Sequence, residues 1–503
     1  MVIFEFILDK IYNKTMDRTI QVGDYILFRS GENAGYLYID YVDPEIMATD
    51  VTNPNNKGKI ILLNGQWKIQ GLFQEHILTF ISKDEYNPED YLSKLPPDIL
   101  RKVALVLPVS NIVNVCTINK YLKEYICDDE QFWQDRYVQD YGVPREIDLK
   151  GWKYMYRYSN NLYVIGLNDN GQLGTGNTDH VSVLTLIQEI KAETAAVNVS
   201  HSIVIDIHNN VWAAGDNQYG QLGLTDTRYA RHTFFFVQIP ELKGKSASLG
   251  CDHTLVLDID NSVWVFGKND RGQLGVDFRY NFNPVKLPNI KAKAISAGSF
   301  HSLILDFDGN VWVLGDNKCG QLGLGEQPYN YENYPVKILD IKAKAIAAGH
   351  FHSMIIDHEN NVLVFGADDD GQLGLDQFYH VNVPTKLPNI KAKKISTNAS
   401  TSLILSEDNI VYGFGVNEYG QLGNHSEHKI FSPVKVFDFA AADISAGFNH
   451  SLITDTDGYV WLLGKHVKGG LFNKGQVPPV KLNNNIRAKA IAAGYGYSLI
   501  VSE

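Results

Sequence analysis

The chain is poor in cysteine and has no long hydrophobic run. Its four cysteines contain no Cys-x-x-Cys pair, which argues against a disulfide scaffold or a zinc module and is typical of a reducing compartment. No apolar run is long enough to span a bilayer. The opening residues lack a basic segment and Glu5 interrupts them, so no signal peptide is predicted. We expect an intracellular protein, cytoplasmic or nuclear, with no membrane partner.

Basic residues are the minority among the charges. The chain has 45 Lys and Arg residues and 57 Asp and Glu residues, and the resulting net charge of −12 disfavours nucleic acid as a partner. A hydrophobic fraction of 44% indicates a globular chain, and 503 residues indicate more than one domain. The abundance of Asn, Ile, Lys and Tyr agrees with an AT-rich genome, such as that of a protist or of a virus whose protein acts in a host cell.

A repeat fills the C-terminal two thirds of the chain. The tetrapeptide Gly-Gln-Leu-Gly occurs six times at intervals of 48–52 residues, and a seventh copy is degenerate. An apolar strand ending in Gly precedes each copy, and a strand that mostly begins with His follows it. Repeats of short strands that cannot bury their own faces predict the blades of a β-propeller. The copies begin at Gly171, Gly220, Gly272, Gly320, Gly371, Gly420 and Gly469.

The phase of the repeat predicts how the ring closes. The array opens at residues 161–166, which match the strand before the tetrapeptide. It ends at residues 493–501, which match the strand that follows the tetrapeptide. The sequence therefore predicts seven blades, with residues near 490–501 paired beside the strand 162–166.

These repeats resemble the family named regulator of chromosome condensation 1, whose members are seven-bladed propellers. The resemblance covers residues 155–503. It implies one activity to weigh, guanine-nucleotide exchange on a small GTPase, which a founding member performs. The even blade spacing leaves no room for the long insertion that this member uses, and its basic tail has no counterpart here. A small GTPase is therefore the less favoured partner.

Residues 92–141 have apolar side chains at helical spacing and resemble an F-box. The Leu-Pro opening and the closing Phe132-Trp133 match that family, whereas the tryptophan expected after Cys116 is missing. The resemblance implies a helical bundle that docks a Skp1-like adaptor of a ubiquitin ligase. The alternative is a bundle that only supports the propeller. The implied adaptor-binding residues are Leu95, Pro96, Ile99, Leu100, Leu107 and Ile112.

The first 87 residues alternate apolar and polar side chains between turn signals. This pattern predicts a small β-rich domain of no recognised family. The predicted fold class is thus mainly β, with a seven-bladed propeller at 155–503, an F-box-like bundle at 92–141 and a β domain at 1–87.

No nucleophile–base pair, phosphate loop or enzyme motif is present in the sequence. The recurring histidines occur once per blade and are absent from two copies, which favours packing over metal binding. We expect no enzyme activity, no cofactor and no metal. The Asp368-Asp369-Asp370 run is explained by its turn.

Two surface features could recognise a protein target. One is a lysine series, as at Lys342 and Lys344, which could also be a solvated strand edge. The other is the variable loop after each tetrapeptide, because variable loops on a rigid scaffold carry binding and aromatic residues are good anchors. The preferred hypothesis is a substrate-recognition subunit of a Skp1-cullin-F-box ubiquitin ligase; the alternatives are an exchange factor and a non-catalytic scaffold. The candidate target-binding residues are Tyr229, Phe235, Tyr280, Tyr329, Tyr331 and Phe378.

Overall fold

The computed structural model forms two compact units, Met1–Arg136 and Tyr137–Glu503, and each is considered by itself. In the first unit it describes the strands between residues 25 and 78, residues 101, 104 and 105, and residues 123–136. In the second it describes residues 137–141, 153 and 159–503, apart from 226–230, 327–329, 424–426, 466–478 and 484–485.

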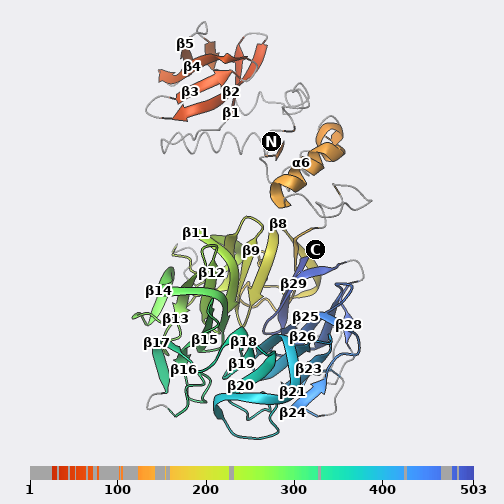
Figure 1. The fold of residues 1–503 in the computed structure, drawn as a ribbon. Coiled ribbons are helices and arrows are strands. Elements are labelled where there is room, and N and C mark those ends of the chain that lie inside the picture. Colours follow the sequence, from red (N-terminus) through yellow and green to blue (C-terminus); the bar gives the residue numbers. More distant parts are fainter. Residues whose placement is uncertain are drawn as a thin grey trace. The chain divides into compact units, whose positions relative to one another are not determined.

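The strands of the first unit form one antiparallel meander in which each strand pairs with the next along the chain (Figure 1). The hydrogen-bonded register of the first hairpin runs from Tyr25 opposite Tyr38 to Ser30 opposite Asn33. The prediction of a small β-rich fold here is confirmed. The strands are β1 (Tyr25–Ser30), β2 (Asn33–Val42), β3 (Ile46–Asp50), β4 (Asn53–Leu63), β5 (Gln66–Gly71) and β6 (His76–Leu78).

The described residues that follow include a π-helical turn η1 (Lys123–Cys127) and the helix α6 (Glu130–Tyr141). Asp129 caps α6, because its Oδ1 accepts the N–H of Gln131 at 3.0 Å. Phe132 and Trp133 are buried, and the Trp133 indole N–H donates to the carbonyl oxygen of Cys127 at 3.0 Å. Cys127 forms a disulfide bond. The lack of a Cys-x-x-Cys pair therefore does not exclude a disulfide in this chain.

The propeller consists, over the described part of residues 159–503, of seven blades of four antiparallel strands. In each blade the second and third strands form a hairpin of nearly continuous buried apolar residues, which is why these strands read as Val- and Ile-rich runs. We number the blades 1 to 7 by these hairpins: β30 (Tyr497–Ser502) with β7 (Asn161–Gly166), β9 (His201–Asp206) with β10 (Asn210–Asp216), β12 (His253–Asp258) with β13 (Ser262–Lys268), β15 (His301–Asp306) with β16 (Val311–Asp316), β19 (His352–Asp357) with β20 (Asn361–Gly366), β22 (Thr401–Ser406) with β23 (Val411–Val416), and β26 (His450–Asp455) with β27 (Val460–Gly464).

The remaining strands form the inner and outer edges of the blades. Several long strands serve as the outer strand of one blade and then as the inner strand of the next, as when β8 pairs first with β7 and then with β9. The long strands are β8 (Val181–Val197), β11 (His232–Leu249), β14 (Tyr280–Ala297) and β21 (Val381–Asn398), and the separate ones are β17 (Tyr331–Lys337), β18 (Ala343–Ala348), β24 (Lys429–Lys435), β25 (Ala441–Ala446), β28 (Val480–Lys481) and β29 (Ala488–Ala493).

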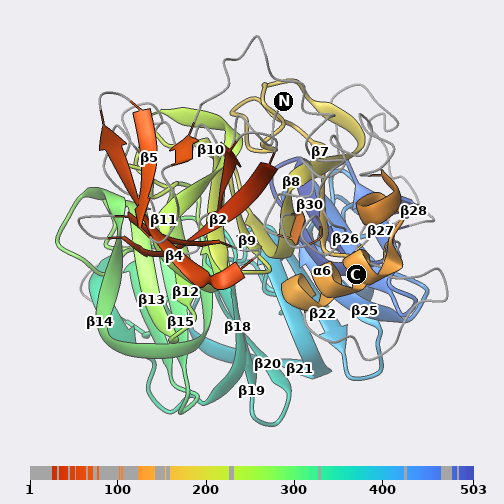
Figure 2. The ribbon, with the colours of Figure 1, turned by 90° about the horizontal axis from the view of Figure 1, so that it is seen from above.

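Blade 1 closes the ring with strands from both ends of the array. Strand β30 pairs with β7, with Tyr497 opposite Gly166 and Val501 opposite Leu162 (Figure 2). The prediction that residues near 490–501 pair beside the strand 162–166 is confirmed. No peptide bond joins the two halves of this blade, so backbone pairing and side-chain packing hold the seam.

A repeated hydrogen-bond chain joins neighbouring blades through the histidines. His301 Nε2 lies 3.0 Å from Ser353 Oγ in the next blade, and that hydroxyl donates to the carbonyl oxygen of Gln321 at 2.8 Å. Because the serine proton is used on the glutamine carbonyl, Nε2 must be the histidine atom that carries a proton. The same contact recurs in the pairs His201–Thr254, His253–Ser302, His352–Ser402 and His450–Ser498.

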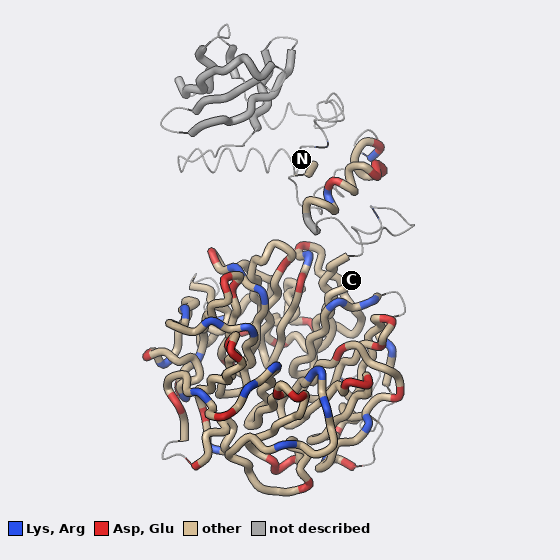
Figure 3. Tube along the Cα trace, in the orientation of Figure 1, with Lys and Arg blue, Asp and Glu red and all other residues tan. Residues whose placement is uncertain are grey.

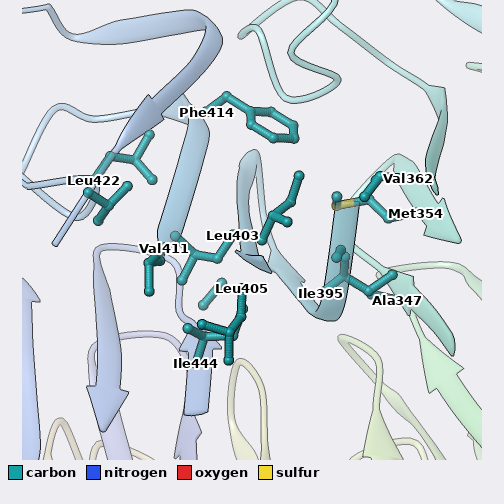
Figure 4. Packing of buried hydrophobic residues seen from close by; sticks show 14 of the residues in the cluster. Ala347, Met354, Val362, Ile395, Leu403, Leu405, Val411, Phe414, Leu422 and Ile444 are labelled. Atoms are coloured by element: carbon teal, nitrogen blue, oxygen red, sulfur yellow. The ribbon is translucent and has the colours of Figure 1, made fainter. Parts of the chain in front are cut away.

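The junction between blades 6 and 7 lacks this contact. Blade 6 has Thr401 in place of histidine, and the Thr401 hydroxyl donates within its own blade to the carbonyl oxygen of Val416 at 3.3 Å. The facing Ser451 Oγ is buried without a partner. Apolar packing holds this junction instead, in a cluster that runs from Met354 and Val362 through Leu403 to Ile444 (Figure 4).

Candidate functional site

The propeller has two faces, which we define by the turns that emerge there. The turn face carries the turns before each second strand, such as 298–300 and 349–351, and the Gly-Gln-Leu-Gly loops. The hairpin face carries the turns between second and third strands, such as 307–310. Because neighbouring strands are antiparallel, these two sets of connections lie at opposite ends of the blades.

A row of aromatic rings crosses the turn face, and we call it the aromatic belt. The ring centroids of Phe448 and Tyr495 are 4.5 Å apart, and those of His350 and Phe448 are 5.8 Å apart. Phe351 continues the row, 6.0 Å from His350 and 6.1 Å from Phe300. These five residues come from the inner-to-second-strand turns of blades 4, 5, 7 and 1.

The belt is continuous because blade 6 contributes a small residue. At the position of the belt residues blade 6 has Ala399, whose carbonyl oxygen accepts the N–H of His350 at 2.9 Å. This small side chain lets His350 of blade 5 reach Phe448 of blade 7. The rings thus meet although their turns are about 100 residues apart in the sequence.

The belt borders a cavity of about 190 Å³ on the propeller axis, lined by the inner strands of all seven blades. The lining contains no Asp, Glu, Lys or Arg side chain, and burial lowers the pKa of His350. Its serines hold neighbouring blades together, as when the Ala348 N–H donates to Ser296 Oγ at 2.9 Å. Three lining atoms are buried without a protein partner, which is uncommon in a native protein. They are Asn198 Oδ1, Ser299 Oγ and His350 Nε2.

A second hollow of about 420 Å³ lies beside the belt, between Phe300 and Phe351. Lys268 lines it, with its Nζ 3.2 Å from Asp252 Oδ2 and 4.6 Å from the ring centroid of Tyr219. Burial alone would lower the pKa of Lys268, but the charge of Asp252, the hydrogen bond to it and the charge of Asp270 together raise the pKa, so this amine is a fixed cation. The turn face therefore combines aromatic surface with charged groups.

One loop of the turn face contains a buried acid where the other described loops have asparagine. Asn269 accepts the N–H of Leu274 at 2.8 Å and donates to the carbonyl oxygen of Val276 at 2.6 Å. Asp368 accepts the equivalent Leu373 N–H at 2.8 Å, but its Oδ2 is buried without a partner. Burial is the largest cause, and together with the charge of Asp369 it raises the pKa of Asp368 to about 7.

Asp368→Asn is expected to stabilise the propeller above neutral pH. The native carboxyl has a pKa above its unfolded value of 3.8, so the native state loses stability as the pH rises from that value through 7. The amide avoids this loss, and the gain should reach roughly 1–3 kcal/mol at alkaline pH and shrink towards acid. Urea unfolding of both proteins at about pH 5.5 and 8.5 measures the difference.

The matched control for this variant is Asp408→Asn, which changes an exposed carboxylate in the turn after β22, away from Asp368. It should leave stability within about 0.5 kcal/mol of the wild type. A gain for Asp368→Asn that is equal at both pH values, or no gain, would contradict the assignment of a buried protonated acid.

The structure does not gather the predicted target-binding aromatics into one cluster. Phe235, Tyr280, Tyr331 and Phe378 are exposed and belong to four different blades. Phe235 forms an isolated β-bridge with Thr175 of the preceding blade. The ring centroids of Phe378 and of Phe431 in the following blade are 4.6 Å apart. Tyr229 and Tyr329, and the adaptor-binding candidates, lie outside the described residues: Leu95, Pro96, Ile99, Leu100, Leu107 and Ile112.

The predicted lysine series lies on the hairpin face. Basic and acidic residues are interspersed over the propeller as a whole (Figure 3). Lys342 is exposed, and its Nζ donates to the carbonyl oxygen of Asp308 at 3.0 Å and to Asn310 Oδ1 at 2.8 Å. Lys391 makes the same contacts with Glu359 and Asn361. These lysines brace the hairpins of their own blades, which explains their recurrence without a ligand.

The recurring histidines, which were considered as metal ligands, form hydrogen bonds across the blade junctions. Burial lowers the pKa of His201, His253, His301 and His352 to about 3, so these rings are neutral. Among the described residues, no group of three or more His, Cys, Asp or Glu side chains could hold a metal ion. Within the same part of the chain, no helix is long and apolar enough to cross a membrane.

The aromatic belt was not predicted from the sequence, although a signal was available. Phe300, Phe351, Phe448 and Tyr495 each lie one or two residues before the recurring His position. An aromatic residue that recurs at one phase of a closed ring must lie near its counterparts in other blades.

The family model described as "RCC1-like domain" matches residues 155–439. The chain is 37% identical to the human X-linked retinitis pigmentosa GTPase regulator over 123 residues, which are 24% of this chain and 12% of that protein. It is 32% identical to the Protein RCC2 homolog of Xenopus laevis over 120 residues, which are 23% of each protein. The matched stretches thus span less than a quarter of these relatives.

Solved structures with the same fold include human WBSCR16, with a TM-score of 0.60 and 20% identity over 69% of this chain and 99% of that chain. Prp20p from Saccharomyces cerevisiae has a TM-score of 0.60 and 21% identity over 68% of this chain and 91% of that chain. At these identities the likeness concerns the fold.

Proposed function

The chain belongs to the RCC1-like domain family, and on this premise we propose that it is a non-catalytic binding subunit whose propeller captures a partner protein on its turn face. The observation that carries the proposal is the aromatic belt beside a cavity with unpartnered polar atoms. Aromatic residues supply much of the binding energy at protein interfaces. Buried polar atoms without partners gain hydrogen bonds when a ligand reaches them.

The contacts of the histidines support a structural role for the groups that are most often catalytic. Each neutral ring is bound to a hydroxyl of the next blade, as His253 is to Ser302 at 3.1 Å. A general base needs a pKa near the working pH, whereas burial holds the pKa of these rings near 3. We therefore propose that the propeller binds its partner without chemistry.

We further propose that residues 92–141 dock a Skp1-like adaptor, so that the captured protein is held near a ubiquitin ligase. The F-box resemblance supports this, together with the buried Phe132-Trp133 pair in α6, which matches the close of that motif. A chain that binds the target with one domain and the ligase with another raises the concentration of the target near the ligase, without any new contact between the two.

A small GTPase is the second candidate for the partner. One relative is named a GTPase regulator, and the structure of yeast Prp20p is described with its binding to Gsp1p and histones. In this case the turn face would still be the binding surface, and the complex would accelerate nucleotide exchange.

Affinity capture of the full chain from its own or host cells tests both binding surfaces. Leu95→Ala combined with Pro96→Ala should lose a Skp1-like adaptor and keep the target, because the two units have separate cores. Phe448→Ala combined with Tyr495→Ala should lose the target by roughly tenfold or more and keep the adaptor, because it removes two anchors of the belt. Phe378→Ala, on the outer part of blade 5, is the matched control.

Each outcome separates the alternatives. Wild-type protein that captures no Skp1-like adaptor would remove the ligase hypothesis. A captured GTPase whose nucleotide exchange the protein accelerates would favour the second candidate. Loss of the target with Phe378→Ala but not with the belt variant would move the binding surface to the outer loops.

A further inference from the structure

The belt lies directly against the mouth of the axial cavity. The Tyr495 N–H donates to the carbonyl oxygen of Asn198 at 2.7 Å, and the Phe448 N–H donates to that of Gly494 at 3.0 Å. Asn198 lines the cavity, and Tyr495 is 38% exposed. One ligand group at this place can therefore touch the two rings and reach the cavity together.

Among the side-chain atoms of Asn198, which lines this cavity, the one without a partner is a hydrogen-bond acceptor. Its Nδ2 donates to the carbonyl oxygen of Leu249 at 2.6 Å. Because a carbonyl oxygen only accepts hydrogen bonds, the side-chain atom beside it must be the amide nitrogen. The orientation of the side chain is thus fixed, and the atom without a partner is Oδ1. A ligand that satisfies this atom must donate a hydrogen bond.

The aromatic rings beside the cavity favour a positively charged donor. The cavity is lined by no Lys or Arg side chain that could donate to Asn198 Oδ1, and by no Asp or Glu side chain. Aromatic rings carry negative charge on their faces and attract cations within about 6 Å of the ring centroid.

The turn face already holds its own cations on aromatic rings. Lys268 Nζ lies 4.6 Å from the ring centroid of Tyr219, and Lys465 Nζ lies 5.0 Å from that of Tyr419. The belt rings Phe448 and Tyr495 form no cation–π contact with a described Lys or Arg residue, which leaves this pair available.

From this arrangement we infer that the turn face recognises a basic peptide segment of its partner. A Lys or Arg side chain of that segment lies against Phe448 and Tyr495 and donates a hydrogen bond to Asn198 Oδ1. The inference rests on the proposed function and specifies the chemistry of the protein that is captured. An acidic segment would bring carboxylates, which only accept hydrogen bonds, to an unpartnered acceptor.

Fluorescence anisotropy with two labelled peptides tests this chemistry on the full chain. The probes are a nine-residue peptide of alternating Gly and Arg and its counterpart with Glu in place of Arg. The protein should bind the basic peptide and not the acidic one. With Trp, Tyr or Leu at the exposed position 495, the affinity for the basic peptide should decrease in that order. The cation–π attraction is strongest for the indole ring and is absent for leucine. The loss from Tyr495→Leu should be roughly two- to thirtyfold.

Two further variants make the result specific. Phe448→Leu keeps an apolar side chain and should weaken binding by a similar factor, whereas Phe378→Leu should leave it unchanged. Equal binding of both peptides, no binding of either, or a flat series at Tyr495 would overturn the inference. If the Phe448 and Tyr495 variants lose the captured protein but the basic peptide does not bind, the proposed function stands and the cationic chemistry is wrong.

Discussion

Deletion of residues 497–503 is expected to unfold the propeller. The deletion removes β30, whose side chains Tyr497, Leu499, Ile500 and Val501 are completely buried. Each buried side chain of this kind contributes about 1.5–3 kcal/mol, and the sum is comparable to the whole stability of a typical domain. The deletion also exposes the edges of β29 and β7 and removes the hydrogen bond from the Tyr497 hydroxyl to the carbonyl oxygen of His201.

Circular dichroism and gel filtration measure this effect, which should appear as a lost melting transition and aggregation. Deletion of Glu503 alone is the control, because its side chain is exposed and it lies beyond β30. A truncated protein that is monomeric and melts at the wild-type temperature would show that the seam does not hold the ring closed.

Acid is expected to unfold the propeller steeply between about pH 6.5 and 3. Burial lowers the pKa of four junction histidines from 6.5 to about 3, so within this window the unfolded chain binds more protons than the native state. Their contribution is fully present above 6.5 and is lost as the pH falls. Each histidine costs about 1.4 kcal/mol per pH unit, and four together cost about 5 kcal/mol per unit.

His301→Thr separates this effect from the titration of carboxylates. The variant copies the junction that the chain itself has at Thr401 and Ser451, so its shape is tolerated in the fold. It should lower stability at about pH 8 by roughly 1–3 kcal/mol, because Ser353 loses its donor. It should also reduce the histidine part of the acid slope by about a quarter, as measured by urea unfolding across the window. An unchanged slope would mean that the histidines do not drive acid unfolding.

Much of the candidate site could not be predicted from the sequence. The outer aromatics such as Phe378 were chosen because they lie in variable loops, but the structure places them on separate blades. The belt residues lie in short turns, where one aromatic residue per turn does not indicate which rings meet. The side-chain environment of the F-box candidates lies outside the described residues, so the adaptor hypothesis rests on the resemblance and on Phe132-Trp133.

The sequence by itself determined the number of blades, their strands and the seam at residues 161–166 and 497–502. These follow from local patterns, because apolar alternation, turn residues and the phase of a repeat are all set within about 50 residues of chain. Only the tertiary structure decided which side chains meet across blades. His350 reaches Phe448 because Ala399 is small, and Asn198 Oδ1 is left without a partner because the Leu249 carbonyl holds the amide nitrogen. Such contacts exist only once the ring has closed, because closure brings together residues that the repeat keeps far apart in the chain.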